Sequence, residues 1–170
     1  MKSHPGGEAH TRRMLALADM QPGASVLDMG AGSGEAVKLL HSLGYDAKGI
    51  DLEPRSEDVE QGDFLHLPYS DESFDAVLSQ CAFFISGDVS GALREAHKVL
   101  KPGGTLMLSD VFFEAPAPVM EAAGFELLQI EDMTDAWREY YLEALWRGRD
   151  CGCALPRGKC TYLLIIAGKV

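Results

Sequence analysis

Three glycines at alternate positions, Gly30, Gly32 and Gly34, stand in the segment VLDMGAGSGE, between an apolar run and a segment with helical periodicity. Glycine adopts positive φ angles without strain and lets a ligand approach the bare main chain. The first turn of a following helix also presents unpaired N–H groups. The motif therefore indicates a binding loop, although a tight turn is the alternative for a glycine motif that stands alone.

Two carboxylates follow the loop at the ends of the next two apolar runs. Asp51 ends the run in AKGIDLEP, and Asp63 ends the run in VEQGDFLHLP. In open parallel sheets the ligand crevice lies beyond the carboxyl ends of the strands, where a carboxylate accepts hydrogen bonds from ribose hydroxyls. Asp51 suits that role, while Asp63 can accept from an exocyclic amine with Phe64 packed on a purine. We therefore expect an adenosine site.

Two further acidic residues bear on the identity of the ligand. Glu35 occupies the position of the last glycine in the dinucleotide motif G-x-G-x-x-G, and a carboxylate at the helix entrance disfavours a pyrophosphate there. The loop is therefore expected to bind a ligand without phosphates, which argues against NAD. Asp28 lies inside the first apolar run, where it either contributes to the ligand site or holds the loop through hydrogen bonds to its amides.

The elements that position these residues follow from hydrophobic periodicity. Short apolar runs alternate with longer amphipathic segments, a pattern typical of α/β folds with a mostly parallel sheet. The predicted strands are residues 25–29, 47–51, 59–63, 74–79, 105–110, 126–130 and 161–168. The predicted helices are residues 8–20, 35–43, 89–100, 119–123 and 134–146. Periodicity does not fix whether the final strand is parallel or antiparallel.

Composition limits the partners and the location that we expect. With 170 residues the chain suits a single domain, residues 1–170. The net charge of -11 disfavours nucleic acid and anionic membrane surfaces, so a small-molecule partner is expected. There is no apolar run long enough to span a membrane and no signal-peptide core, so we expect a cytoplasmic protein. The four cysteines form no disulfide framework.

Four segments resemble the motifs of a known family. VLDMGAGSG, GIDLEP, GDFLHLPYSDESFDAVLS and LREAHKVLKPGGTLMLSDV are similar, in order and spacing, to those of class I S-adenosylmethionine-dependent methyltransferases. The similarity is strongest to the group related to quinone-biosynthesis methyltransferases, the methyltransferase domain 11 group. It covers about residues 5–110. It implies a Rossmann-like, seven-stranded, mostly parallel sheet with helices on both faces and an antiparallel last strand.

The resemblance also implies S-adenosyl-L-methionine as cofactor, S-adenosyl-L-homocysteine as product and a role for particular residues. Gly30, Ala31 and Gly32 would lie along the amino acid part of the cofactor. Asp51 would bind the ribose and Leu52 would pack on adenine. The remaining expected contacts are Asp63 with the adenine amine, Phe64 with the adenine ring edge, and Ser79 and Gln80 with the methionine moiety; Asp28 is counted with this site.

The expected reaction is an in-line displacement at the methyl group, for which the protein mainly supplies alignment of the reactants. A base is needed only if the nucleophile arrives protonated. The sequence names no catalytic residue. Residues near the strand ends that could meet the acceptor include Cys81 and Asp110, although the neighbouring aromatic residues Phe83, Phe84 and Phe112 are more typical of core packing.

The segment CGCALPRGKC leaves a second interpretation open. Cys151, Cys153 and Cys160 could bind a soft metal or metalloid, but their spacing is not the C-x-x-C pair of common zinc sites, and free thiols are the alternative. The short region after Asp110 also allows an inactive cofactor-binding module or a cysteine-based, metal-binding regulatory module. The methyl acceptor is not predicted, and a homodimer or partner chain could complete its wall.

Overall fold

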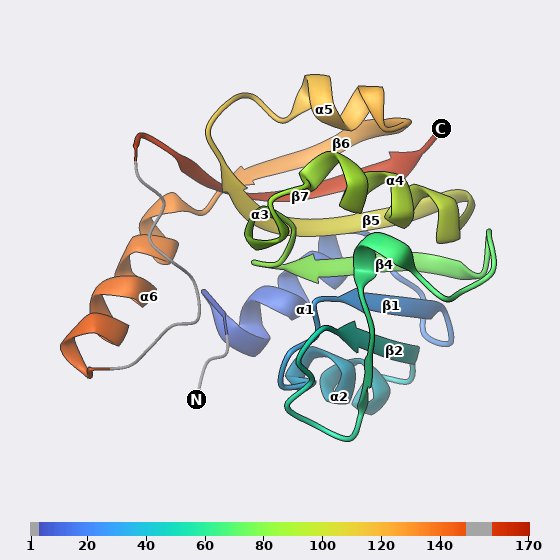
Figure 1. The fold of residues 1–170 in the computed structure, drawn as a ribbon, viewed down its shortest axis with the longest axis horizontal. Coiled ribbons are helices and arrows are strands. Elements are labelled where there is room, and N and C mark those ends of the chain that lie inside the picture. The colour runs from blue at the N-terminus through green and yellow to red at the C-terminus, as the bar shows by residue number, and fades with distance from the viewer. Residues whose placement is uncertain (1–3, 149–157) are drawn as a thin grey trace.

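The computed structural model describes residues 4–148 and 158–170. Within these residues, seven strands form one sheet in the order β3-β2-β1-β4-β5-β7-β6 (Figure 1). The strands are β1 Ser25–Met29, β2 Asp46–Asp51, β3 Val59–Gln61, β4 Phe74–Gln80, β5 Leu100–Phe112, β6 Phe125–Asp132 and β7 Thr161–Lys169. The helices are α1 Gly7–Leu17, α2 Glu35–Ser42, α3 Phe83–Ser86, α4 Val89–Val99, α5 Ala117–Ala122 and α6 Thr134–Trp146, with a 3-10 helix, η1, at Phe64–His66.

Strand directions explain where a ligand crevice forms. The pairs β1–β2, β1–β4, β2–β3 and β4–β5 are parallel, whereas β7 lies antiparallel between β5 and β6. The antiparallel last strand and the mostly parallel seven-stranded sheet are therefore confirmed. The chain runs outward from β1 to β3 and then returns to β4 beside β1, so the strand order reverses at the carboxyl ends of β1 and β4.

Helices cover both faces of the sheet, as expected, because successive strand residues point to opposite sides. On one face, Leu27 of β1 packs in a cluster that includes Leu93 of α4. On the other face, its neighbour Val26 packs with Met14 of α1 and Val37 of α2. β1 is thus buried between two helical layers, which fixes the position of the loop that follows it.

Several element boundaries differ from the expected ones, most of all at β3 and β5, and two short helices were not expected. β3 ends at Gln61, two residues before Asp63, because the Asp63 side chain accepts a hydrogen bond from the Leu65 N–H and caps η1. β5 begins at Leu100 rather than at residue 105 because Leu100 pairs with β4 before an irregularity in the register. η1 and α3 were not expected, since helices of three or four residues have no readable periodicity.

α6 extends away from the sheet at the end where the parallel strands terminate (Figure 1). It is attached through an aromatic cluster in which Trp137 stacks on Tyr162 of β7 at 6.1 Å between ring centroids, and Tyr141 contacts Trp137 edge-on at 5.1 Å. No helix in the described ranges 4–148 and 158–170 has the length and apolar character needed to cross a membrane.

Candidate functional site

The loop between β1 and α2 has the conformation that its glycines allow. Gly30, Gly32 and Gly34 all have positive φ angles, of 87°, 49° and 73°. The Gly30 N–H donates to the Ile50 carbonyl at 2.9 Å, which ties the loop to β2. A Cβ atom at Gly30 would lie 2.3 Å from the Cβ of Ala82, so this close approach to the segment after β4 requires glycine.

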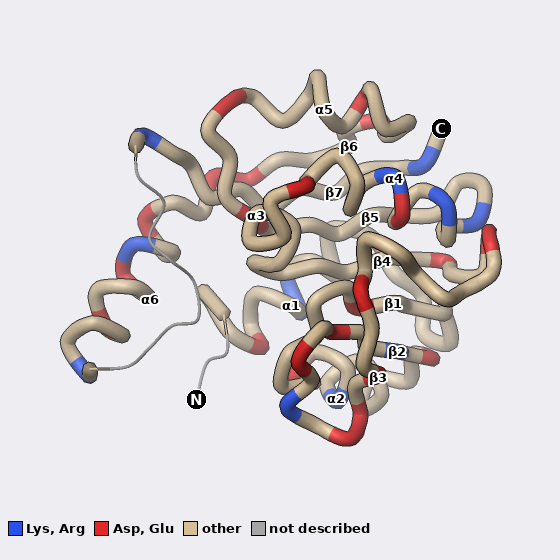
Figure 2. The backbone as a smooth tube through the Cα atoms, viewed as in Figure 1, with Lys and Arg blue, Asp and Glu red and all other residues tan. Residues whose placement is uncertain are grey.

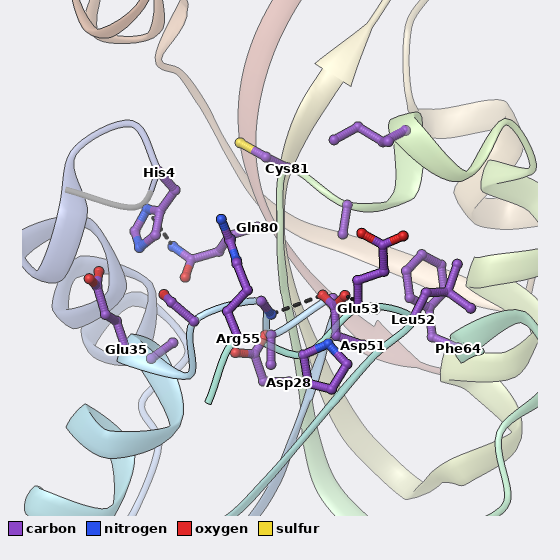
Figure 3. Close-up of a pocket in the computed structure, with 18 of the residues that line it drawn as sticks. His4, Asp28, Glu35, Asp51, Leu52, Glu53, Arg55, Phe64, Gln80 and Cys81 are labelled. Carbon is purple, nitrogen blue, oxygen red and sulfur yellow. Dashed lines mark hydrogen bonds between the residues drawn. The ribbon is translucent and has the colours of Figure 1, made fainter. Parts of the chain in front are cut away.

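Asp51 is the side chain that connects β2 to the glycine loop. One carboxylate oxygen accepts from the Gly32 N–H at 2.9 Å, and the other accepts from the Glu53 N–H at 2.9 Å (Figure 3). Each oxygen has a further lone pair, so the carboxylate can accept hydrogen bonds from a ligand as well. Asp51 therefore holds the loop and faces the ligand space at once.

Asp28 is almost fully buried at the base of the same site, with 3% of its surface exposed. Burial, and secondarily the negative charge of Asp51, raises the pKa of the Asp28 carboxyl to about 7. The Gly32 amide donates to Asp51, so the loop-holding role that the sequence allowed for Asp28 belongs to the neighbouring carboxylate. Asp28 lies beside the loop as a carboxyl group that titrates near neutral pH.

Asp63 and its neighbours form the other side of the site. The Asp63 carboxylate accepts from the Leu65 N–H at 2.8 Å and lies 3.0 Å from His66 Nδ1. The backbone hydrogen bond first, and His66 second, lower the pKa of Asp63, which keeps it an ionised acceptor. Phe64 is largely buried, while Leu52 is 60% exposed. Phe64 and Leu52 could therefore contact a planar ligand, through a ring edge and through an exposed aliphatic side chain.

These residues line one cavity of about 1490 Å³. Nine of the ten expected residues line it: Asp28, Gly30, Ala31, Gly32, Asp51, Leu52, Asp63, Phe64 and Gln80. The structure differs for Ser79, which is fully buried and donates a hydrogen bond to the Met29 carbonyl at 2.7 Å. Successive side chains of β4 point to opposite faces of the sheet, so Ser79 and Gln80 face different sides, and only Gln80 lines the cavity.

Several lining residues were not found from the sequence. His4 precedes α1, and Arg55 follows β2 with its guanidinium over Gly32, where a Cβ would lie 2.8 Å from Nη2. Tyr140, Glu143, Ala144 and Arg147 of α6 also line the cavity. The three- and four-residue spacing of this last group is a detectable signal for one helix face. No local pattern places that face over the glycine loop.

The described residues include only one of the three cysteines of the predicted metal or metalloid site. Cys151 and Cys153 lie outside the described residues. Cys160 is half-buried and packs against the cluster of Trp137, Tyr141 and Tyr162. Among residues 4–148 and 158–170, no three His, Cys, Asp or Glu side chains are grouped so that they could hold a metal ion.

Of the expected acceptor-side candidates, Cys81 lines the cavity and Asp110 does not. Cys81 has a φ of 58°, uncommon for a residue with a side chain, and its sulfur lies 3.1 Å from the Tyr162 hydroxyl. Asp110 is buried and accepts from the N–H groups of Phe84 and Val111; burial raises its pKa to about 6. Asp110 thus holds α3 against the end of β5.

Comparison with known sequences identifies the family. A family model described as a methyltransferase domain matches residues 27–108, which span the glycine loop, Asp51 and Asp63. The uncharacterized methyltransferase YodH of Bacillus subtilis is 31% identical over 149 residues, covering 76% of this chain and 64% of YodH. These matches support the class I S-adenosylmethionine-dependent methyltransferases as the family of this chain. The chain spans less than two thirds of the length of the first curated methyltransferases that it matches.

Solved structures show that this chain has a fold shared by a methyltransferase and a cyclase. Phosphoethanolamine N-methyltransferase 2 of Haemonchus contortus, solved with S-adenosyl-L-methionine, has a TM-score of 0.78 and 17% identity, covering 98% of this chain and 53% of that one. The [4+2]-cyclase SpnF has a TM-score of 0.75 and 22% identity, covering 96% and 82%. Because a cyclase shares the fold, the fold alone does not determine the reaction.

Proposed function

We propose that this chain transfers the methyl group of S-adenosyl-L-methionine to a small-molecule acceptor. The observation that carries the proposal is the convergence of a glycine loop, Asp51 and Asp63 on one cavity in a chain of this family. The cavity offers a bare backbone, a ribose acceptor and an adenine site in that order. When bound, the cofactor supplies a methyl group on a sulfonium that is already activated for displacement.

The residues of the site fit this cofactor. The backbone from Gly30 to Gly32 would accommodate its amino acid part, since a Cβ at either glycine would meet a neighbouring side chain. Asp51 would accept from the ribose hydroxyls, and Leu52 would cover the adenine. Asp63 would accept from the adenine amine, because its carboxylate is partly exposed at the rim of the cavity.

The charge of the cavity favours a cationic ligand. Its lining includes six carboxylates and two guanidinium groups. The carboxylates are Asp28, Glu35, Asp51, Glu53, Asp63 and Glu143, and the guanidinium groups are those of Arg55 and Arg147. Acidic residues gather around β2 and β3 (Figure 2). A sulfonium cofactor with a net positive charge is attracted to such a site, whereas a pyrophosphate is repelled.

The size of the cavity supports a second ligand beside the cofactor. A volume of about 1490 Å³ exceeds the roughly 300–1,000 Å³ of most single small-molecule sites. The wall available to an acceptor includes Cys81, Ile85 and Tyr140. The phosphoethanolamine methyltransferase with the same fold is named for a small acceptor, which supports a small acceptor here.

A second candidate function is cofactor binding without methyl transfer. The likeness to the cyclase SpnF favours it, since that protein has the same fold and a different named activity. Release of S-adenosylhomocysteine during turnover with any acceptor would exclude this candidate.

Four expectations from the sequence stay predictions. They are the single domain, the cytoplasmic location, the absence of nucleic-acid and membrane partners, and a homodimer that completes the acceptor wall.

Calorimetry with S-adenosylhomocysteine tests cofactor binding. Asp51→Asn keeps the shape of the side chain and removes its charge, so we expect affinity to fall about 10- to 100-fold, as for lost charge-assisted hydrogen bonds. Asp46→Asn is the matched control, because Asp46 is exposed at the opposite end of β2, and its affinity should stay within about twofold. No binding at millimolar ligand, or equal binding by the two variants, would contradict the proposal.

A further inference from the structure

His4 is the residue of the cavity wall that the cofactor roles leave unexplained. It lies three residues before the start of α1, is half-buried, and its ring faces Gln80 at the end of β4 (Figure 3). The Gln80 amide nitrogen is 3.4 Å from His4 Nδ1, and the amide oxygen of Gln80 accepts from the Thr11 hydroxyl. The ring is therefore held beside the strand end at which the acceptor wall begins.

The hydrogen bonds of His4 define which ring nitrogen is basic. Nδ1 lies 3.1 Å from the carbonyl oxygen of Pro5, which can only accept, and 3.4 Å from the amide nitrogen of Gln80, which can only donate. Nδ1 can satisfy only one of the two, and we assign it the proton because the Pro5 contact is the shorter. In a neutral ring the lone pair is then on Nε2. That atom has no hydrogen-bond partner in the described part of the chain. An oriented imidazole with a free lone pair on a cavity wall is the arrangement that a general base needs.

The surroundings of His4 keep the ring neutral. Burial is the largest effect and lowers the pKa of His4, while the Pro5 hydrogen bond and the charge of Glu35 on α2 act in the opposite direction. On α1, the His10 ring lies 6.1 Å away, and burial lowers its pKa to about 4. Cys81, the residue after Gln80, places a further ionisable side chain on the cavity wall.

We propose that His4 is the general base of the reaction and that the acceptor is an amine or a hydroxyl that reaches the site with its proton. This inference rests on the proposed methyl transfer. A bond forms between the acceptor heteroatom and the methyl carbon, and the bond from that carbon to sulfur breaks with its electrons on sulfur. The proton leaves the heteroatom for His4 Nε2, and Nδ1–H continues to donate to Pro5.

The test compares acceptors with and without a proton to lose. The probes are glycine, catechol and 2-mercaptoethanol, the last at a pH where it is a thiolate, each with labelled S-adenosylmethionine. His4→Gln keeps a polar side chain and removes the basic nitrogen. We expect it to lower kcat about 100-fold or more for a proton-bearing probe, with thiolate methylation and S-adenosylhomocysteine affinity within about threefold of wild type.

His41→Gln is the matched control. His41 is exposed on α2 and bonds to the Ala47 carbonyl away from the cavity, so all rates should stay within about twofold. An unchanged kcat with glycine or catechol overturns the inference. So does an equal loss with the thiolate, or a His4→Gln variant that no longer binds S-adenosylhomocysteine, since His4 then serves the cofactor or the fold.

An NMR titration of His4 decides the inference independently of turnover. In the complex with S-adenosylhomocysteine we expect a His4 pKa below 6.5, and kcat/KM for a proton-bearing probe to rise with pH through that value. A His4 pKa above 7 would overturn the inference, because the ring would carry its proton at neutral pH. If wild type methylates no probe although the cofactor binds, the proposed function fails, while the titration still judges His4.

Discussion

At the scale of single residues, His10 occupies an environment that lowers the stability of the fold. Its ring is 4% exposed, and neither ring nitrogen has a hydrogen-bond partner in the described part of the chain. A buried polar group without a partner costs about 1–3 kcal/mol. The ring packs against His4, which lines the cavity, and against Tyr162 of β7. It therefore supports the cavity wall although its burial lowers the stability of the fold.

Replacing His10 should therefore stabilise the protein, and more so in acid. The folded pKa of about 4 lies below the unfolded value of about 6.5, so the unfolded chain binds an extra proton between these pH values. The folded protein therefore loses stability through His10 as pH falls from 6.5 toward 4. We expect His10→Phe to raise the free energy of unfolding in urea, by roughly 2 kcal/mol more at pH 5 than at pH 7.

His66→Phe is the control for that measurement, because the His66 side chain is 83% exposed. Its effect should differ by less than about 0.5 kcal/mol between the two pH values. A gain for His10→Phe that is the same at pH 5 and pH 7 would show that His10 titrates normally in the folded chain.

At the scale of elements, β2 positions the site through its carboxyl end and through the close packing at Gly49. Asp51 ends the strand at the cavity, and Gly49 lies where a side chain has no room. A Cβ atom on Gly49 would lie 2.7 Å from the Cβ of Ala31 in the glycine loop and 2.7 Å from Val37 on α2. The loop and the helix after it therefore lie directly against the backbone of β2.

Gly49→Ala tests this close packing. The added methyl group must displace the loop or α2, so we expect a loss of about 1–3 kcal/mol in the free energy of unfolding and weaker binding of S-adenosylhomocysteine. Gly168→Ala in β7 is the control, since its Cβ would meet nothing closer than Leu128 at 3.6 Å. Equal stability and affinity for the two variants would contradict the proposed packing.

The strands themselves were accessible from the sequence, and some local details were not. Hydrophobic periodicity located all seven strands that the structure describes, but the antiparallel direction of β7 came from family resemblance, because a connection of that length allows either direction. Asp63 was expected to end a strand, but β3 ends two residues earlier at Gln61. The Asp63 side chain instead accepts a hydrogen bond from the Leu65 N–H at the start of η1. Such capping depends on a single local hydrogen bond and leaves no periodic signal.

At the scale of the whole molecule, the cavity is assembled from segments that are distant in the sequence. The floor, formed by the loop after β1 and the end of β2, follows from motif spacing. The wall contains His4 from the start of the chain and Tyr140 to Arg147 from α6, near its end. Their approach depends on how α1 and α6 pack at the end of the sheet, which local patterns do not encode. Of the acceptor side, the sequence therefore indicated Cys81 but neither His4 nor the α6 residues.

The most direct test of the central claim is a crystal structure of the chain with S-adenosylhomocysteine. The account predicts both ribose hydroxyls within about 3 Å of the Asp51 carboxylate oxygens. It also predicts adenine between Leu52 and Phe64, and the amino acid part along Gly30 to Gly32. A ligand bound in the cavity with its ribose away from Asp51, or with its adenine on the α6 side, would contradict the account.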